Sequence, residues 1–411
     1  MDERSEPDSQ AGAVTGPLDG IRVLDLTRIL AGPTMTQTLG DFGADIIKVE
    51  RPGAGDDTRA WGPPYVTGKD GKPTPESAYY LAANRNKRSI AIDMATPEGA
   101  ALIRRLARHC DVLVENFKLG GLKKYGLDYE SLSGEHPGLV YCSITGFGQT
   151  GPNAHRPGYD LLAQGYGGIM SLTGEPEGEP MKVGVGIADV VCGLYGGLGI
   201  LAALRHRDQT GLGQHIDVSL VDSQVSWLVN EGTNYLLSGE EPKRRGNQHP
   251  NIVPYQVFQA IDGHVIVAAG NDGQYQRLCA LIGLEELASD PRFATNPKRL
   301  ENRQVLIPLL ADKIATLNKQ ELVDGMEANN VPGGAINTIA EVFESEQVLA
   351  RGMKISMPQP KAESGQVELI GNPVKFSRTP VTYRHPPPQC GEHTDELLGE
   401  ILGEETATLR K

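Results

Sequence analysis

The chain has 411 residues, 39% of them hydrophobic, and a formal net charge of −13 at pH 7. This length suits roughly two or three domains, and the acidic balance argues against general binding of nucleic acid or anionic membranes. The five cysteines are scattered without a CxxC pair, so the sequence favours a reduced cytoplasmic setting and offers no metal site. We expect a cytoplasmic protein whose partner is a small molecule.

The first half of the chain alternates strand-like and helical segments. Residues 1–17 are polar and acidic, which predicts a disordered tail. From Ile21 onward, the expected strands are 21–27, 45–50, 87–94, 111–117 and 139–148, and the expected helices include 33–44 and 96–110. Strands that alternate with helices predict an α/β fold with a Rossmann-like, doubly wound parallel sheet.

The second half of the chain changes pattern. A helical stretch at 218–239 leads into a charged, turn-rich segment, and 255–271 is typical of a hairpin that turns at Asp262-Gly263. The sequence therefore predicts two domains, a large α/β domain that binds the ligand and a smaller α+β domain. Their expected bounds are 18–225 plus 331–411 for the large domain, and 226–330 for the small domain.

Ligands of doubly wound sheets bind beyond the carboxyl ends of the strands, which draws attention to the loops that follow them. Several basic residues lie at or near these loops in an otherwise acidic chain: Arg51, Lys87, Arg88, Lys118, Lys123 and Lys124. They are either solvated surface charges, as composition alone suggests, or a site for a phosphate-bearing cofactor.

Asp189 stands directly before a nearly uncharged apolar run, Val190–Leu204, which is shorter than the ~20 residues of a membrane span. An aspartate in this place is typical of a helix N-cap. Four glycines make the helix unusual, because each costs ~1 kcal/mol relative to alanine, and we expect a backbone or a ligand to approach the face of Gly193 and Gly197. The helix N-terminus would also keep the carboxylate ionised. An ionised carboxylate can attack an activated acyl group, so the cap and reagent roles are compatible.

Signatures of commoner enzyme classes are missing from the sequence. The runs "GVGIAD" and "GLYGGLG" do not follow the first strand of a βαβ unit, so they do not form a dinucleotide site. The chain has no Walker A run, no HExxH pair and no GxSxG elbow. The sequence thus argues against nucleotide oxidoreduction, phosphoryl transfer and the common hydrolases.

Seven segments form a recognisable set: "PLDGIRVLDLTRILAGP", "LGDFGADIIKVERPGAGDDTR", "NRNKRSIAIDM", "DVLVENF", "SITGFGQTGP", "GYDLLAQGYGGIMSLTG" and "RRGNQHPNIVPYQ". Together they resemble the family III CoA-transferases of the CaiB/BaiF type, and the resemblance runs from about Gly16 to the C-terminal "GEHTDELL". In "GAGDDTRAWGPP", "YCSITGFGQTGP" and "IVPYQVF" the chain is most similar to the succinyl-CoA-dependent dicarboxylate CoA-transferases.

The resemblance implies a reaction centred on Asp189, which occupies the family's nucleophile position. Its carboxylate would attack the donor thioester to form an aspartyl-acyl anhydride, and CoA thiolate would convert this into an aspartyl-CoA thioester. The acceptor acid would then repeat these steps in reverse. Asp160 matches an acidic position near the nucleophile, Tyr159 belongs to the segment that contacts the thioester arm, and Trp61 aligns with a mobile cover. Coenzyme A would be a substrate, with no permanently bound cofactor.

The resemblance also implies how CoA would be held. Arg51 matches a contact to the adenosine phosphate part of CoA, and Asn116 and Phe117 line the same groove. Lys124 falls where the family often has a basic residue for the nucleotide phosphates. Arg156 is placed with these residues as a further CoA contact.

Recognition of the acid is expected to differ from that in formyl-CoA transferase. Leu30 stands where that enzyme has a glutamine, and Ala95 stands where some members have a phosphate-binding lysine. His249 in "GNQHPNIVPY" would bind the free carboxylate of a dicarboxylic acid, or it is a structural turn histidine. Arg28 is the other candidate for that carboxylate.

The alternative function is that of an α-methylacyl-CoA racemase, which shares the fold and the CoA site but abstracts a proton with a His/Asp pair. In racemases a histidine precedes the aspartate of the "GYD" segment. Here that residue is Tyr159, which is not a base poised near neutral pH. A silent acyl-CoA binder would be expected to lose Asp189. Family members form homodimers with two chains threaded through each other, so an interlocked homodimer is also expected.

Overall fold

The computed structural model describes residues 16–403, which divide into two compact units. The first unit comprises 16–169, 182–233 and 349–403, and the second comprises 170–181 and 234–348. The predicted tail at 1–17 lies outside the described residues, except for its last two positions.

The second unit is larger than the small domain expected at 226–330. It includes 170–181 because the loop around Arg244 holds that segment: Arg244 donates to the carbonyls of Glu175 and Gly178 at 3.2 and 2.6 Å. It extends to 348 because the strand β11 (Gly333–Ala335) pairs with a strand of this unit. Both additions depend on pairing between segments distant in the chain, which local patterns do not reveal.

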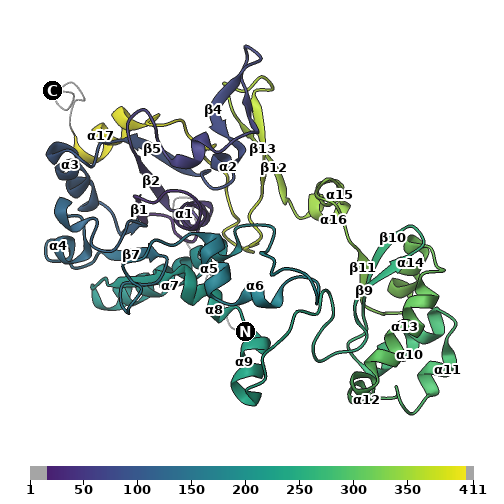
Figure 1. Cartoon of the computed structure of the whole chain (residues 1–411). Coiled ribbons are helices and arrows are strands. Elements are labelled where there is room, and N and C mark those ends of the chain that lie inside the picture. The colour runs from purple at the N-terminus through teal and green to yellow at the C-terminus, as the bar shows by residue number, and fades with distance from the viewer. Residues whose placement is uncertain (1–15, 404–411) are drawn as a thin grey trace, which may run out of the picture. The chain divides into compact units, whose positions relative to one another are not determined.

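A six-stranded parallel sheet forms the centre of the first unit (Figure 1), as the sequence predicted. The strands pair in the order β5 (Lys87–Ala91), β2 (Asp45–Glu50), β1 (Arg22–Asp25), β6 (Val112–Glu115), β7 (Val140–Thr145) and β8 (His215–Ser219). Numbered within the sheet, this is the order 3-2-1-4-5-6 of a Rossmann-like fold. The strand order therefore reverses between β1 and β6, where such folds bind their ligands.

Helices cover both faces of this sheet (Figure 1). Neighbouring residues of β1, Val23 and Leu24, enter opposite cores because side chains alternate along a strand. One core lies under α1 (Ala31–Asp41), α5 (Asp160–Tyr166), α7 (Ile187–Thr210) and α8 (Leu220–Ser226). The other lies under α3 (Pro97–Ala107), α4 (Tyr129–Ser133) and α17 (Thr394–Leu402).

The 24-residue helix α7 carries Asp189 near its start. By length and composition alone it could cross a membrane, with a mean hydropathy of 1.9 in its most apolar window. In the fold, its side chains Ala188, Cys192 and Ile200 enter the same core as α1, which accounts for the apolar composition.

The glycines of α7 let α1 approach closely. A Cβ at Gly193 would lie 2.5 Å from the carbonyl oxygen of Ala31, and one at Gly196 would lie 2.7 Å from Sδ of Met35. The predicted close approach is confirmed, but Gly196 and not Gly197 shares it with Gly193. A Cβ at Gly197 would make only an ordinary contact with Met35, at 3.7 Å.

Shorter elements complete the first unit. Two antiparallel hairpins share a small core around Tyr80 and Met357. They are formed by β3 (Tyr65–Thr67) with β4 (Pro73–Ser77), and by β12 (Lys354–Pro358) with β13 (Gln366–Ile370). The helix α2 (Ala78–Leu81) and the 3-10 turns Asp57–Ala60 and Lys123–Tyr125 belong here, and α6 (Ile169–Leu172) begins at its boundary.

The second unit contains a three-stranded antiparallel sheet packed with helices. The predicted hairpin is confirmed, although it turns at Ile261-Asp262 because Gly263 already pairs with Ala260. Its strands are β9 (Tyr255–Ala260), β10 (Gly263–Ala268) and β11. Its helices are α10 (Asp272–Leu281), α11 (Glu285–Ser289), α12 (Asn296–Glu301), α13 (Arg303–Ile314), α14 (Lys319–Ala328) and α15 (Ile339–Glu344), while α9 (Val229–Ser238) and α16 (Glu346–Ala350) span its boundaries.

Candidate active site

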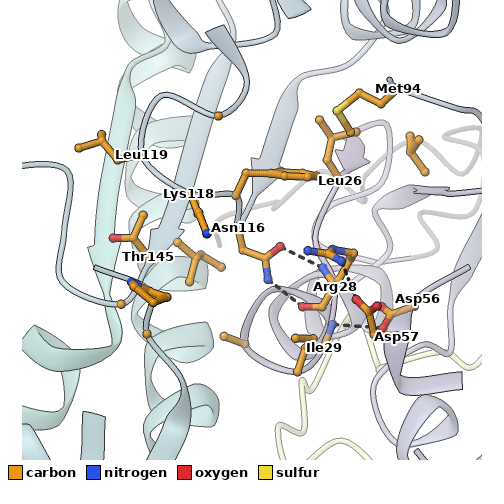
Figure 2. Close-up of a pocket in the computed structure, with 18 of the residues that line it drawn as sticks. Leu26, Arg28, Ile29, Asp56, Asp57, Met94, Asn116, Lys118, Leu119 and Thr145 are labelled. Atoms are coloured by element: carbon orange, nitrogen blue, oxygen red, sulfur yellow. Dashed lines mark hydrogen bonds and ion pairs between the residues drawn. The ribbon is translucent and has the colours of Figure 1, made fainter. Parts of the chain in front are cut away.

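A pocket of about 600 Å³ lies within the first unit, at the switch point of the parallel sheet. Its walls come from the loops that follow β1, β2, β5, β6 and β7, together with the start of α7 (Figure 2). This volume is within the range of about 300–1,000 Å³ typical of small-molecule sites. The position beyond the carboxyl ends of the strands is the one expected from the sequence.

Asp189 lines this pocket but does not cap its helix. The helix begins at Ile187 with Gly186 as N-cap, so the predicted capping role of Asp189 is wrong. Gly186 has no side chain to offer, and Oδ1 of Asp160 instead accepts the backbone N–H of Ala188 at 2.8 Å. The acidic residue that the resemblance placed near the nucleophile is therefore the cap of the nucleophile's helix.

The charge state of Asp189 also differs from expectation. Burial raises the pKa of its carboxyl to about 7, and repulsion from Asp160 adds to this effect. The expectation that the helix terminus keeps the carboxylate ionised is wrong, because the loss of hydration outweighs the favourable dipole. Asp189 therefore titrates near neutral pH.

The reaction rate should follow the ionisation of Asp189. Because only the carboxylate is nucleophilic, kcat/KM should fall about tenfold per pH unit below about pH 7 and level off above it. Steady-state rates of CoA transfer from about pH 5.5 to 9 check this. A flat profile across that range would contradict the role of Asp189.

The same shift has a consequence for stability. The pKa of Asp189 in the folded protein lies above 3.8, the usual value of an aspartate. The stabilisation that follows from this shift is therefore fully present below about pH 3.8 and is lost as the pH rises toward 7. Asp189→Asn should therefore raise Tm at about pH 8, with a gain that shrinks toward pH 4. Thermal melts of both proteins at the two pH values measure the difference.

Three aromatic side chains belong to the surroundings of Asp189 or pack on one that does. Tyr159 is exposed and lines the pocket, while Trp61 packs edge-to-face on Tyr79, with ring centroids 5.2 Å apart. Burial, followed by the charges of Asp189 and Asp160, raises the pKa of Tyr79, so its hydroxyl lies within electrostatic reach of both carboxylates. Sequence reasoning missed Tyr79, because no motif or spacing in "SAYYLAAN" marks it.

Some of the basic residues noted in the sequence line the pocket: Arg51, Lys118, Lys124 and Arg156. The guanidinium of Arg156 lies 4.9 Å from the ring centroid of Phe147, and the ammonium of Lys124 lies 4.6 Å from that of Tyr125. The pocket thus has cations on its wall in an acidic protein, which suits a phosphate-bearing ligand. Their individual contacts with CoA stay predictions.

Two other basic residues do not belong to the site. Lys87 is fully buried in β5 and pairs with Asp25 at 3.2 Å. Arg88 pairs with Asp45 at 2.7 Å and with residues of α17. The prediction that Lys87 and Arg88 contribute to a phosphate site is therefore wrong, because carboxylates within the protein already neutralise both positive charges.

The side chain of Asn116 connects the loop after β6 with the loop after β1 on the pocket wall (Figure 2). Its side chain accepts the N–H of Arg28 at 3.1 Å and donates to the carbonyl of Arg28 at 2.7 Å. The guanidinium of Arg28 pairs with Asp57 at 2.6 Å and lies 5.7 Å from the ring centroid of Phe117. Leu30 and Ala95 line the same pocket.

A buried ion pair supports the loop that contains Arg28. The ammonium of Lys48 donates to Asp56 at 2.9 Å and to the carbonyl of Thr27 at 3.0 Å. Asp56 also accepts the N–H of Ile29, which has a positive φ of 74°. Burial acts to raise the pKa of Asp56, but Lys48 and the surrounding hydrogen bonds lower it to about 2. The pair therefore remains ionised and holds the turn beside the nucleophile.

His249 lies in the second unit. Its Nδ1 accepts the backbone N–H of Asn251 at 3.0 Å, and its carbonyl accepts a hydrogen bond from Arg303 at 2.5 Å. These bonds are what a structural turn histidine makes, and binding of a carboxylate by His249 stays a prediction. Within residues 16–403, no group of three or more His, Cys, Asp or Glu side chains is arranged to hold a metal ion.

Comparison with known proteins assigns the family. The model of CoA-transferase family III matches residues 18–394. The chain is 51% identical over 394 residues to the succinate–glutarate CoA-transferase of Agrobacterium fabrum, covering 95% of this chain and 98% of that protein. It is 42% identical over 395 residues to the mouse succinyl-CoA:glutarate CoA-transferase, covering 96% and 88%.

A solved structure agrees with this assignment. The crystal structure of a CAIB/BAIF family protein from Brucella suis superposes with a TM-score of 0.83 at 50% identity, covering 94% of this chain and all of that one. The family match and the shared fold agree with each other, and Asp189, at the position of the family's nucleophile, lines the pocket. The chain therefore belongs to the family III CoA-transferases and is a CoA-transferase.

Proposed function

We propose that this enzyme moves CoA from succinyl-CoA to a dicarboxylic acid through covalent intermediates on Asp189. The observation that carries the proposal is the carboxylate of Asp189 on the wall of a pocket that also bears cations. Within the described residues no ion pair engages this carboxylate, so its lone pairs are available for attack. The donor and acceptor class follow from the two relatives, which are named for succinate, succinyl-CoA and glutarate.

The proposed chemistry conserves the activation of the acyl group. An Asp189 oxygen attacks the thioester carbonyl, the C–S bond breaks and CoA leaves as thiolate. The thiolate then attacks the Asp189 carbonyl of the anhydride, forming the aspartyl-CoA thioester and releasing the first acid. The acceptor carboxylate attacks this thioester, the C–S bond breaks, and a second mixed anhydride forms as CoA leaves as thiolate. The thiolate then attacks the acceptor's acyl carbon in this anhydride, which forms the new acyl-CoA and releases Asp189 as the carboxylate. Water must be kept away from both intermediates, since hydrolysis would dissipate the activation.

Within the first unit, Arg28 is the candidate residue for binding the second carboxylate of the dicarboxylic acid. Its guanidinium is exposed, and its partner Asp57 is a carboxylate too. A substrate carboxylate would therefore exchange with Asp57 without leaving the arginine unpaired, which limits the desolvation cost. His249 remains the second candidate.

The expected interlocked homodimer is also part of the proposal. Large apolar side chains around α8 and α9 are exposed in the single chain: Val225, Trp227, Val229, Tyr235, Leu236 and Leu237. Leu236 and Leu237 are 82% and 83% exposed. Large apolar side chains that are exposed in this number are typical of interaction surfaces, which supports contact with a second copy of the chain.

The experiment that tests the proposal combines a product screen with a covalent trap. The enzyme and succinyl-CoA are mixed with glutarate and other dicarboxylic or monocarboxylic acids, or with isotope-labelled succinate, and the acyl-CoA products are identified by mass. During turnover, hydroxylamine or borohydride should modify the peptide that carries Asp189. An unmodified peptide, together with exchange of an α-proton for deuterium in a branched acyl-CoA, would favour the racemase alternative.

A further inference from the structure

Two buried polar residues, Glu115 and Ser143, and the exposed His215 form a row across three strands that the transfer chemistry does not use. They lie on the neighbouring parallel strands β6, β7 and β8, with Glu115 directly beside Ser143 in the sheet register. The Ser143 hydroxyl acts to lower the pKa of the neighbouring Glu115 carboxyl, and Ser143 Oγ lies 2.9 Å from Nε2 of His215. Glu115 and Ser143 are 6% and 2% exposed, and the three residues lie outside the pocket lining.

Glu115 connects this row to the pocket wall. Its Oε2 accepts the backbone N–H of Phe117 at 2.8 Å, which closes the turn at the end of β6. Asn116, in the middle of that turn, bonds both backbone groups of Arg28 (Figure 2). Since Asn116 and Phe117 both line the pocket, the carboxyl of Glu115 holds the turn that presents two predicted CoA contacts.

The surroundings of Glu115 allow its charge to change near neutral pH. Burial raises the pKa of Glu115 to about 7, against the lowering effect of the bonds from Ser143 and Phe117. Within residues 16–403 no ion pair compensates its charge. The titratable groups on this side of the sheet are Tyr141 on β7, His215 and Asp217 on β8, and Asp128 and Tyr129 at the start of α4. Cys142 of β7 enters the core on the opposite face, and Arg28 lies over the Phe117 ring.

We propose that Glu115 is a positioning residue for the nucleotide end of CoA, and that proton uptake by its carboxyl weakens CoA binding by loosening the Phe117 turn. In the ionised state, the carboxylate accepts from Phe117 and Ser143, and the Nε2–H of His215 donates to Ser143. When the carboxyl takes a proton from solvent, its O–H donates to Ser143 Oγ. The Ser143 hydroxyl then donates to Nε2 of His215, which is in the tautomer with its proton on Nδ1.

Protonation of Glu115 weakens the hydrogen bond that fixes the turn at Phe117 on the pocket wall. The Phe117 N–H loses an ionised acceptor, and hydrogen bonds to ionised groups are roughly twice as strong as neutral ones. A loss of this size corresponds to about a fivefold change in affinity. This inference rests on the proposed placement of CoA in the pocket.

The test measures binding of dephospho-CoA by calorimetry from about pH 5.5 to 8.5 in an Asp189→Asn background. Dephospho-CoA lacks the phosphate monoester that titrates near pH ~6, and the background substitution removes titration of the nucleophile. The parent should bind about fivefold more tightly at high pH than at low pH. Glu115→Gln should bind weakly throughout, as the parent does at low pH.

Steady-state kinetics distinguish a loss of CoA positioning from a general loss of structure. In the otherwise unaltered enzyme, Glu115→Gln should raise KM for the acyl-CoA about fivefold and leave kcat within about twofold. The matched control is Glu135→Gln, because Glu135 is an exposed glutamate paired with Arg108. This control should keep the pH curve and both kinetic constants of the parent.

Ser143→Ala gives a second, independent readout. Because the bond from Ser143 lowers the pKa of Glu115, its loss should move the midpoint of the binding curve to higher pH. Unchanged pH curves in both Glu115→Gln and Ser143→Ala, with dephospho-CoA still bound, would overturn the inference alone. Failure of the parent to bind dephospho-CoA at any pH would overturn the placement of CoA, and this inference with it.

Discussion

Asp189→Asn should abolish CoA transfer, with a loss of at least about 10⁴-fold in kcat, because an amide cannot form the anhydride or the aspartyl thioester. Removal of a covalent nucleophile eliminates the reaction path and not merely a contribution to binding. The measurement is the rate of acyl-CoA product formation at saturating succinyl-CoA and acid. Residual transfer within tenfold of the parent would exclude Asp189 as the nucleophile.

Binding and fold should survive this substitution. Asparagine has nearly the same shape, and the cap of the helix comes from Asp160, so CoA affinity should stay within about threefold of the parent. The matched control is Asp208→Asn, since Asp208 is an exposed aspartate of the same helix, remote from the pocket lining. It should transfer CoA at the parental rate.

Asp41→Asn should destabilise the first unit by about 3–5 kcal/mol. Asp41 is 1% exposed and accepts two hydrogen bonds from Arg85, at 2.9 and 2.6 Å. It also accepts one from Asn86 at 2.8 Å and one from Asn372 at 2.9 Å. The neutral amide would leave the buried Arg85 without its counter-charge and would turn an N–H toward groups that are themselves donors.

Urea unfolding of the full chain measures this loss. The control is Glu135→Gln, which breaks the exposed pair with Arg108 and should cost less than about 1 kcal/mol. An equal, small change for both variants would contradict the role of Asp41. Asn372 lies far along the chain from Asp41, so the first unit should also become more sensitive to proteolysis near its C-terminal segment.

Much of the fold could be predicted because its signals are local. The runs 45–50 and 139–148 have the residue types of buried strands, and the structure places β2 and β7 within them. Thr96 and Pro97 are typical of a helix start, and Thr96 does cap α3 through the N–H of Gly99. Such patterns depend only on neighbouring residues.

Predictions failed where a distant residue decided the outcome. Asp189 has the local pattern of a cap, but the start of α7 is capped by Asp160, 29 positions earlier. Lys87 was a candidate for a phosphate site, yet its ammonium is buried and pairs with Asp25 of β1, a residue 62 positions earlier in the chain. The spacing of the glycines on α7 indicated a close approach, but only the packed position of Met35 selected Gly196 over Gly197.

The sequence by itself determined the alternation of strands and helices and the order of the motifs that carry the family resemblance. Those properties follow from residue types at fixed spacings along the chain. Only the tertiary structure decided that Asp189 is buried within electrostatic reach of Asp160 and Tyr79, and that Glu115 bonds the backbone of Phe117 on the pocket wall. Burial and charge proximity set these properties, and both arise only when distant segments pack together.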